Sequence, residues 1–232
     1  MTGQGRRRIL VLRFSSAGDV LLTSPALAAL KAAWPDSEIV YAVKEAFAPV
    51  IHHNPYVDRV VTLARGEGVW SFARRLRPHG PFAAVLDLHG KLRSRLLRLL
   101  VGAPAVVWKK RPWRDELPVR LMLRPYRAHA TVAARYHAAV EALVGRTLAP
   151  EPLGFWVGDG EQAEADAALV AAGVVRGRPL LGMAPGANWA TKRWPVQRFA
   201  ALARRAQAAG FQVMVVGSSA ESPLAGAIAA AS

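Results

Sequence analysis

Asp19 stands where a side-chain carboxylate could do chemistry. It follows an apolar run, ILVLRF, and a Ser-Ser-Ala-Gly turn, and an amphipathic helix pattern comes after it. A strand-to-helix turn usually favours a bound anion, because free N–H groups and the helix dipole point at it. Here the chain supplies its own anion, which either caps the helix or acts on a ligand beyond the end of the strand.

The residues after Asp19 offer two places for the helix to begin. Ser24 and Pro25 form a good pair for the N-cap and the first helical position. Either the helix begins at Asp19 and bends near Pro25, or it begins at Ser24 and leaves Asp19 in a loop without a capping role. Local rules leave both open, and with them the choice between capping and catalysis.

The stretch PGANWATKRWP, residues 185–195, also joins an expected strand to an expected helix. It groups backbone amides, a side-chain amide, a hydroxyl and one positive charge, which are the groups that bind a diphosphate. These come from Gly186, Asn188, Thr191 and Lys192. The spacing is neither that of a P-loop nor G-x-G-x-x-G. The alternative is an ordinary turn with a solvated Lys-Arg pair.

A second loop of this kind is VVGSSAES, residues 215–222. Gly217 marks the end of an expected strand, and small residues lead from it to Glu221. A carboxylate at this position could hold ribose hydroxyls, as acids do in nucleotide-binding folds. Local rules favour the simpler interpretation, an acid in the first turn of the last helix.

The stretch DLHGKLRSRLLRLL ends an expected strand near His89 and continues as a basic helix pattern. Lys91, Arg95 and Arg98 are spaced to share one helix face, which could receive phosphates. A solvated helix face is the more ordinary interpretation. Residues 108–116, WKKRPWRDE, interleave basic and aromatic side chains, a pattern that suits nucleic acid, sugar or lipid headgroups.

The amino-acid composition limits which binding partners and which kinds of catalytic site the protein can have. The 232 residues carry 31 Lys and Arg against 16 Asp and Glu, a net charge of +15 that attracts polyanions or simply reflects an Arg-rich composition. The chain has no cysteine, which excludes a disulfide scaffold, a thiolate zinc site and a Cys nucleophile. H-E-x-x-H and G-x-S-x-G are absent, and six scattered histidines make a metal site an unfavoured interpretation. No apolar run approaches the ~20 residues of a membrane-spanning helix, so we expect a soluble or peripheral protein.

Short apolar runs alternate with helix patterns, which predicts a parallel, doubly wound α/β sheet. The runs are nearly continuous in Val, Ile and Leu, as in strands that are covered on both faces. We expect the strands at residues 8–14, 38–43, 59–63, 83–88 and 105–108, and the helices at 19–33, 44–52, 70–77, 91–101 and 129–144.

A second β/α series starts after a Pro- and Gly-containing connection. It predicts strands at 179–184 and 211–216, and helices at 195–209 and from about 223. We therefore divide the chain into a first domain, a connector helix region and a second domain, at residues 1–158, 159–177 and 178–232. Two parallel strands expose their edges and bury little core, so we expect the second domain to be incomplete in this chain.

Four stretches, in this order, resemble glycosyltransferase family 9, the ADP-heptose:lipopolysaccharide heptosyltransferases. SSAGDVLLTSPALAALK is similar to the family's first loop and helix, and DLHGKLRS to its acceptor-side strand end. PGANWATKRWPVQRFAAL is similar to the donor-side loop and helix, and VVGSSAES to the nucleotide-side loop. The resemblance runs from about residue 8 to the end of the chain.

The resemblance implies a GT-B fold of two Rossmann-like domains, an acceptor-side domain followed by a nucleotide-sugar-binding domain. It implies inverting, metal-independent transfer of a heptose from ADP-heptose to the Kdo/heptose inner core of lipopolysaccharide, without a cofactor. Asp19 matches the family's proposed general base, which takes a proton from the attacking hydroxyl. Lys192 matches the residue that stabilises the departing diphosphate.

The resemblance also assigns binding residues. The nucleotide-sugar side comprises Ser16, Gly18, Gly186, Ala187, Asn188, Thr191, Lys192, Gly217 and Glu221. The acceptor side comprises His89, Lys91, Arg93 and Arg114. At position 187, alanine lacks a hydroxyl that some members offer. Which heptose is transferred, and to which position, is not distinguished.

Two alternatives to an active enzyme stay open at this point. The family's later Asp-Ser/Thr-Gly-Pro…His segment has no counterpart in the sequence, which allows an inactive, truncated remnant. The charge alone would also suit a basic nucleic-acid-binding α/β domain, although no helix-turn-helix, RRM or zinc motif supports it. For the enzyme we expect a monomer on the cytoplasmic face of the inner membrane, acting on a lipid-linked anionic saccharide and not on nucleic acid.

Overall fold

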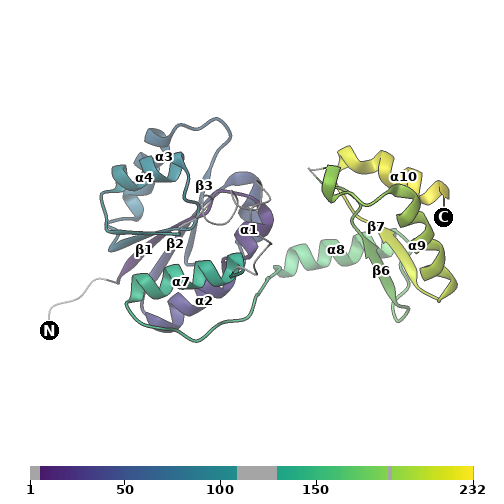
Figure 1. The fold of residues 1–232 in the computed structure, drawn as a ribbon, viewed down its shortest axis with the longest axis horizontal. Coiled ribbons are helices and arrows are strands. Elements are labelled where there is room, and N and C mark those ends of the chain that lie inside the picture. Colours follow the sequence, from purple (N-terminus) through teal and green to yellow (C-terminus); the bar gives the residue numbers. More distant parts are fainter. Residues whose placement is uncertain (1–5, 109–129, 188–189, 232) are drawn as a thin grey trace, which may run out of the picture. The chain divides into compact units, whose positions relative to one another are not determined.

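The computed structural model describes residues 6–108, 130–187 and 190–231, and it forms two compact units, Met1–Gly158 and Asp159–Ser232. The first unit is built on a five-stranded parallel sheet with the strand order β3-β2-β1-β4-β5 (Figure 1). Its strands are β1 (Arg8–Leu12), β2 (Glu38–Lys44), β3 (Arg59–Leu63), β4 (Ala84–Asp87) and β5 (Ala105–Val107). The predicted parallel, doubly wound sheet is confirmed.

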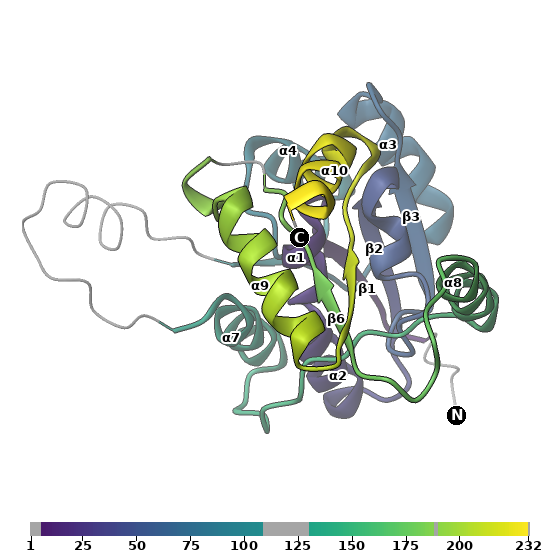
Figure 2. The same ribbon diagram turned by 90° about the vertical axis from the view of Figure 1, so that its right-hand side faces the viewer.

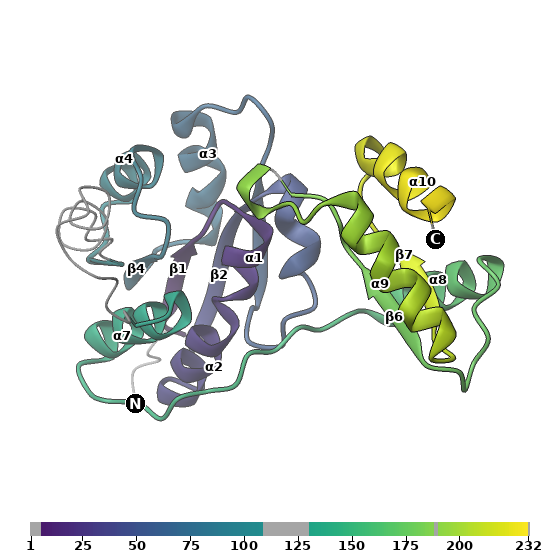
Figure 3. The ribbon, with the colours of Figure 1, turned by 45° about the vertical axis from the view of Figure 1, so that its right-hand side comes forward.

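Helices cover both faces of this sheet. One face carries α2 (Ser24–Ala33) and α7 (Val132–Val144), and the other carries α3 (Val69–Leu76) and α4 (Leu92–Val101), as Figure 3 shows. Each face buries its own apolar cluster, which explains why the strands read as continuous apolar runs rather than as alternating ones.

Strand β1 lies in the centre of the sheet and serves both clusters. Ile9 and Val11 pack with Leu27 and Tyr136 on the α2–α7 side. Leu10 and Leu12, the alternate residues, belong to the cluster of the α3–α4 side. All four β1 residues are inaccessible to solvent. The central strand is therefore held from both faces, and the exposed turn that carries Asp19 follows directly after its carboxyl end.

The expected helix at 19–33 is two helices, and the predicted start at Ser24 is right for the second of them, although Asp19 lies in a short preceding helix and not in a loop. Helix α1 (Ala17–Leu21) begins before Asp19, and α2 begins at Ser24. Pro25 has no N–H to donate, so α1 cannot continue through it. Thr23 stabilises the connection between α1 and α2, because its hydroxyl donates to the Val20 carbonyl at 2.7 Å.

The expected helix at 44–52 is a 3-10 helix over Glu45–Val50. Pro49 lies inside it, and a proline ring removes one donor and collides with the preceding turn of an α-helix. The segment is therefore too short and too interrupted for the predicted α-helix.

The second unit contains a two-stranded parallel sheet of β6 (Leu180–Met183) and β7 (Gln212–Val215). Figure 2 shows these strands with α9 (Val196–Ala208) and α10 (Ser222–Ala231); α8 (Asp159–Ala171) opens the unit. Met183, Ala203 and Ile228 form its small buried cluster. In the described part of the chain, no helix has the length and apolar character needed to cross a bilayer.

Helix α4 offers a direct test of the packing, because its leucines point both inward and outward. Leu97 is fully buried, whereas Leu99 is 72% exposed. We expect Leu97→Ala to lower the free energy of unfolding of the first unit by about 2–5 kcal/mol, and Leu99→Ala to change it by less than about 0.5 kcal/mol. Urea denaturation followed by circular dichroism measures both, and equal effects would contradict the assigned orientation of α4.

Candidate active site

Asp19 caps its own helix with one of its two carboxylate oxygens. The Ser16 N–H donates to Asp19 Oδ2 at 3.2 Å, and the Ser16 hydroxyl donates to the same oxygen at 3.0 Å. Ser16 and Gly18 are exposed beside it, at the carboxyl end of β1. The capping role that the sequence suggested is present, and it uses Oδ2 alone.

Beneath Asp19 lies a buried arginine that sequence reasoning missed. The side chain of Arg13 is only 8% exposed, and its Nη2 lies 2.5 Å from Asp19 Oδ2. Its Nη1 donates to the Leu88 carbonyl at 2.7 Å, just beyond β4. One guanidinium thus joins the carboxyl ends of β1 and β4. The only signal in the sequence was a charge placed inside the apolar run ILVLRF.

Two aromatic rings complete the surroundings of this guanidinium. The Arg13 Cζ lies 5.7 Å from the centroid of the Tyr136 ring and 5.9 Å from that of Trp108. The rings themselves meet edge to face at 5.4 Å. Aromatic faces attract cations, so they help to keep a charge in a place with little water.

The other oxygen of Asp19 is available. No hydrogen bond from any described residue reaches Oδ1. Burial raises the pKa of the carboxyl, but the Ser16 N–H, the charge of Arg13 and the Ser16 hydroxyl lower it by more, so the pKa lies below the ordinary 3.8. Near neutral pH the site therefore presents an ionised carboxylate with one oxygen held and one free.

The loop after β4 is organised by a fully buried carboxylate. Asp87 Oδ1 accepts the N–H of His89 at 3.0 Å and that of Gly90 at 2.9 Å. Asp87 Oδ2 lies 3.0 Å from Arg98 Nε, close enough for an ion pair but without hydrogen-bond alignment. Arg98 therefore supports the loop and does not belong to the solvated basic face predicted for the helix.

His89 is a buried, neutral residue of this loop. Its ring meets Phe14 edge to face, with 5.1 Å between the centroids. Burial, with Arg13 and Lys91 nearby, lowers the pKa of His89 to about 4. Its Nδ1 is buried without a hydrogen-bond partner in the described chain. Lys91 and Arg93 follow it and are exposed, so three of the predicted acceptor residues lie together, and the fourth, Arg114, lies outside the described residues.

In the second unit, Glu221 repeats the arrangement of Asp19. The Ser218 N–H donates to Glu221 Oε2 at 2.7 Å, and the Ser218 hydroxyl donates at 2.9 Å. These bonds hold the pKa of the Glu221 carboxyl below its usual value. The residue closes a 3-10 turn, Ser219–Glu221, that directly precedes α10.

Two glycines make room for this carboxylate. A Cβ at Gly186 would collide with Glu221 Oε1, and one at Gly217 would stand 2.9 Å from Oε2. The loops after β6 and β7 therefore meet at Glu221. The sequence identified all three residues, and the structure brings them into contact.

Lys192 presents a free cation on the loop after β6. It ends a short 3-10 helix, Ala190–Lys192, and both Lys192 and Thr191 are exposed. Arg193 braces the loop, because its Nε donates to the Ala187 carbonyl at 2.7 Å. The Lys192 ammonium has no partner among the described residues. Asn188 lies outside the described residues.

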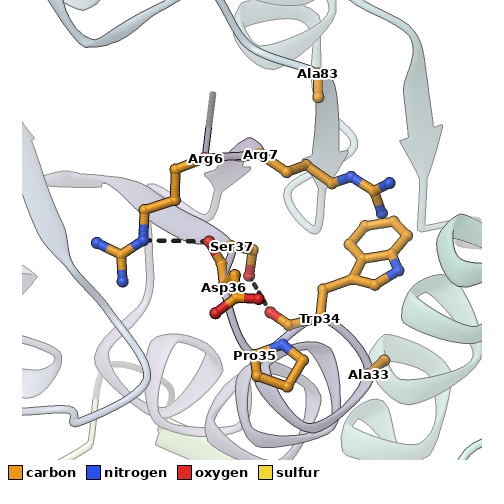
Figure 4. Close-up of a pocket in the computed structure, with 8 residues that line it drawn as sticks. All are labelled: Arg6, Arg7, Ala33, Trp34, Pro35, Asp36, Ser37 and Ala83. Carbon is orange, nitrogen blue, oxygen red and sulfur yellow. Dashed lines mark hydrogen bonds between the residues drawn. The ribbon is translucent and has the colours of Figure 1, made fainter. Parts of the chain in front are cut away.

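A hollow of about 870 Å³ at the opposite end of β1 is not part of this site. Figure 4 shows the Arg7 guanidinium over the Trp34 ring, 4.2 Å from its centroid, and Arg6 Nε donating to the Asp36 carbonyl at 3.1 Å. These cations are already engaged, and the carboxyl end of α2 disfavours an added anion there. Among the described residues, no group of three His, Cys, Asp or Glu side chains gathers as a metal site would require.

The fold is that of GT-B glycosyltransferases. The crystal structure of the glycosyl transferase family 9 from Veillonella parvula matches with a TM-score of 0.81 at 23% identity, covering 96% of this chain and 66% of the other. E. coli ADP-heptose lipopolysaccharide heptosyltransferase II matches with a TM-score of 0.72 at 24% identity, covering 97% and 69%.

The chain belongs to glycosyltransferase family 9 (heptosyltransferase), whose family model matches residues 69–231. Lipopolysaccharide heptosyltransferase 1 of Pseudomonas aeruginosa is 33% identical over 96% of this chain and 64% of its own length. Lipopolysaccharide heptosyltransferase 2 of Salmonella typhimurium is 27% identical over 91% and 63%. The chain thus spans somewhat less than two thirds of the length of these relatives.

The contact between Arg13 and Asp19 predicts a pH effect of defined sign. Because the folded-state pKa of Asp19 is lowered, its ionised form stabilises the fold above pH ~4, and this stabilisation is lost as the pH falls through the folded-state pKa. We expect Arg13→Met to raise the pKa of Asp19, which carbon-13 NMR of the side-chain carboxyl can follow.

Asp58 is an internal control for this titration. Its carboxylate is bound by Lys31 Nζ at 2.8 Å and by the Ile39 N–H at 2.7 Å, and Arg13 makes no contact with it. Its pKa should stay lowered in the variant. An unchanged pKa of Asp19 in Arg13→Met would show that the guanidinium does not set the charge of this carboxylate.

Proposed function

We propose that the protein is an inverting glycosyltransferase that moves a heptose from ADP-heptose to the Kdo/heptose inner core of lipopolysaccharide. The observation that carries this proposal is the free Oδ1 of an ionised Asp19 at the carboxyl end of β1. The family and the names of the relatives support the substrate class.

The proposed glycosyl transfer requires one proton transfer to a group of the protein. A hydroxyl oxygen of the acceptor attacks the anomeric carbon of the donor heptose and forms the new C–O bond. Asp19 Oδ1 takes the hydroxyl proton as the oxygen becomes bonded. The bond from the anomeric carbon to the diphosphate oxygen breaks with its electron pair, and ADP leaves from the face opposite the attack, which inverts the configuration.

The role of Arg13 in this step is to keep Asp19 ionised and oriented. Its guanidinium binds Oδ2, so the carboxylate has a fixed direction and Oδ1 remains free for the proton. A lowered pKa makes Asp19 a weak base, but it ensures that the base is deprotonated whenever the acceptor binds. Before the acceptor proton is transferred, the Arg13 guanidinium stays paired with the ionised carboxylate of Asp19.

Most of the proposed donor residues lie in the second unit, and two of them, Ser16 and Gly18, lie beside Asp19 in the first. Lys192, with its unpaired ammonium, would neutralise the charge that develops on the departing diphosphate. The backbone at Gly186 and Ala187, with Thr191 and Gly217, would contact the phosphates, and Glu221 Oε1 would accept a ribose hydroxyl. An E. coli heptosyltransferase of this fold has been solved with ADP and with ADP-2-deoxy-2-fluoro heptose.

Acceptor recognition is assigned to the loop after β4. Lys91 and Arg93 are exposed cations next to the rigid turn built on Asp87. They would bind the carboxylates and phosphates of the inner core. Metal-independent transfer, in which Lys192 does the work of a divalent cation, forms part of the proposal and predicts ADP release that survives a chelator.

Asp19→Asn tests the proposed base. We expect ADP release, measured with ADP-heptose and a Kdo-bearing acceptor, to fall by at least about 100-fold. The amide oxygen can still accept from Ser16, and Arg13 can still donate to the Leu88 carbonyl, so the variant should fold, although with lower stability because the ion pair is lost. Asp36→Asn, an exposed residue at the far end of the unit, is the matched control and should leave ADP release unchanged. Retained turnover in Asp19→Asn together with a large loss of stability would make Asp19 a structural cap only.

Gly186→Ala tests the donor side independently. The added Cβ displaces the Glu221 carboxylate, whereas a Cβ at Gly182, in β6, meets nothing within 4 Å. We expect calorimetry to show at least about tenfold weaker ADP binding for Gly186→Ala and wild-type binding for Gly182→Ala. Equal affinities of the two variants for ADP would show that Glu221 is not part of the donor site. If the unmodified chain binds no ADP, the assignment of the donor site to these loops is wrong.

A further inference from the structure

Helix α4 exposes a row of leucines that the proposed reaction does not use. Leu92, Leu96 and Leu99 are 73%, 44% and 72% exposed. They are four and three residues apart, so they lie on one face of the helix. Leu97, on the opposite face, is fully buried against the sheet. We call Leu92, Leu96 and Leu99 the α4 leucine face.

Positive charges flank this face. Arg93 and Arg95 are exposed and fall on either side of the leucine row around the helix. The neighbouring helix α3 adds Trp70, which is 77% exposed, and Arg74, one turn further along. Figure 1 shows α3 and α4 next to each other on the same side of the sheet.

Arg74, Arg93 and Arg95 have no ion pair with another described residue, whereas the nearby Arg75 is paired with Glu67, its Nε lying 3.0 Å from Oε1. Between Gly68 and Trp108 the sequence holds seven Lys and Arg residues and one acid, Asp87. Asp87 is fully buried and is bound by Arg98 and by backbone N–H groups. The surface of α3 and α4 is therefore apolar and positively charged, and its occupant must be apolar and negatively charged.

We propose that the α4 leucine face docks the protein on the surface of an anionic lipid bilayer. Leucine side chains would enter the boundary between headgroups and acyl chains, and the flanking arginines would reach the lipid phosphates while their aliphatic stems stay in the apolar layer. Trp70 suits the same depth, because tryptophan concentrates at membrane interfaces. A nucleic acid would match the charge but offers no apolar layer for three leucines.

The position of the helix agrees with a membrane-bound acceptor, and in this respect the inference rests on the proposed function. Helix α4 begins at Leu92, directly after the β4 loop that carries His89 and Lys91, and Arg93 lies in its first turn. That loop lies at the edge of the sheet where Asp19 lies, because Arg13 joins the two. The β4 loop, at the amino end of the docked helix, would thus be in position to bind a lipid-linked saccharide.

Vesicle sedimentation of the 232-residue chain tests the proposal. The probes are vesicles of phosphatidylethanolamine with phosphatidylglycerol, and vesicles of phosphatidylcholine alone. We expect strong binding to the anionic vesicles, weakened by salt, and little binding to the neutral ones. The triple variant Leu92→Ser/Leu96→Ser/Leu99→Ser should bind the anionic vesicles about tenfold or more weakly.

A matched variant controls for the loss of any three exposed apolar side chains. Leu153, Phe155 and Val157 are 55%, 58% and 46% exposed and lie elsewhere in the same unit. Their replacement by serine should leave vesicle binding within about twofold of the wild type. Circular dichroism should report native folding for both variants, since neither set lies in the core, and the single variant Leu96→Ser should show a smaller loss in the same direction.

Three results would overturn the docking surface. One is an absence of binding of the unmodified chain to anionic vesicles, and another is equal binding by both triple variants. The third is a dimer, seen by sedimentation velocity, that the α4 variant alone dissociates while vesicle binding is unchanged, which would assign the face to a second copy.

A lipid-free acceptor separates this inference from the proposed function. ADP release with a water-soluble Kdo saccharide should be unaffected by the α4 triple variant. If vesicle binding follows the prediction and the chain releases no ADP, the proposed reaction fails and the docking surface stands. If ADP is released and the α4 variant binds vesicles normally, the reverse holds.

Discussion

The first unit depends on the burial of one positive charge. The Arg13 guanidinium is buried at the carboxyl end of the central strand, β1. An unpaired charge at this place would lower the stability of the fold strongly. Asp19 supplies the countercharge, Leu88 supplies a carbonyl, and Tyr136 and Trp108 supply aromatic faces. The contacts tie α1, the β4 loop, α7 and the end of β5 together. The ionised carboxylate that stabilises this buried charge therefore stands at the place where catalysis is proposed.

Asp19 can therefore be a helix cap and a catalytic base at the same time. A carboxylate has two oxygens, and in Asp19 both structural duties fall on Oδ2. The second oxygen is left without a partner in the described chain, in a direction set by the first. The rigidity that a cap provides is what a base needs, because proton transfer depends on the distance and angle to the reacting hydroxyl.

The fold could be predicted from the sequence because its signals are local. Runs such as EIVYAV carry enough branched apolar residues to identify a strand covered on both faces, and the observed β2 covers nearly the same residues. A bend near Pro25 and a start at Ser24 were both offered by the sequence, but the separate short helix α1 was not predicted, since its end depends on the missing N–H of Pro25 and on the Thr23 hydroxyl together. Arg13 was not predicted either: its partners at 19, 88, 108 and 136 meet only after folding. The contact between Gly186 and Glu221 is of the same kind, whereas each loop alone was evident.

The carboxylate of Glu221 fills the space between two loops, and this limits how the chain can vary. A side chain of glutamate length reaches from the turn after β7 to the backbone at Gly186, and both glycines are needed only while that length is kept. Aspartate at 221 would withdraw the carboxylate by one methylene, free the space that a Cβ at 186 would occupy and remove the shortest contact of a Cβ at 217. Substitutions at these three positions are therefore coupled, and in other members of the family we expect larger residues at 186 or 217 to accompany a shorter or uncharged one at 221.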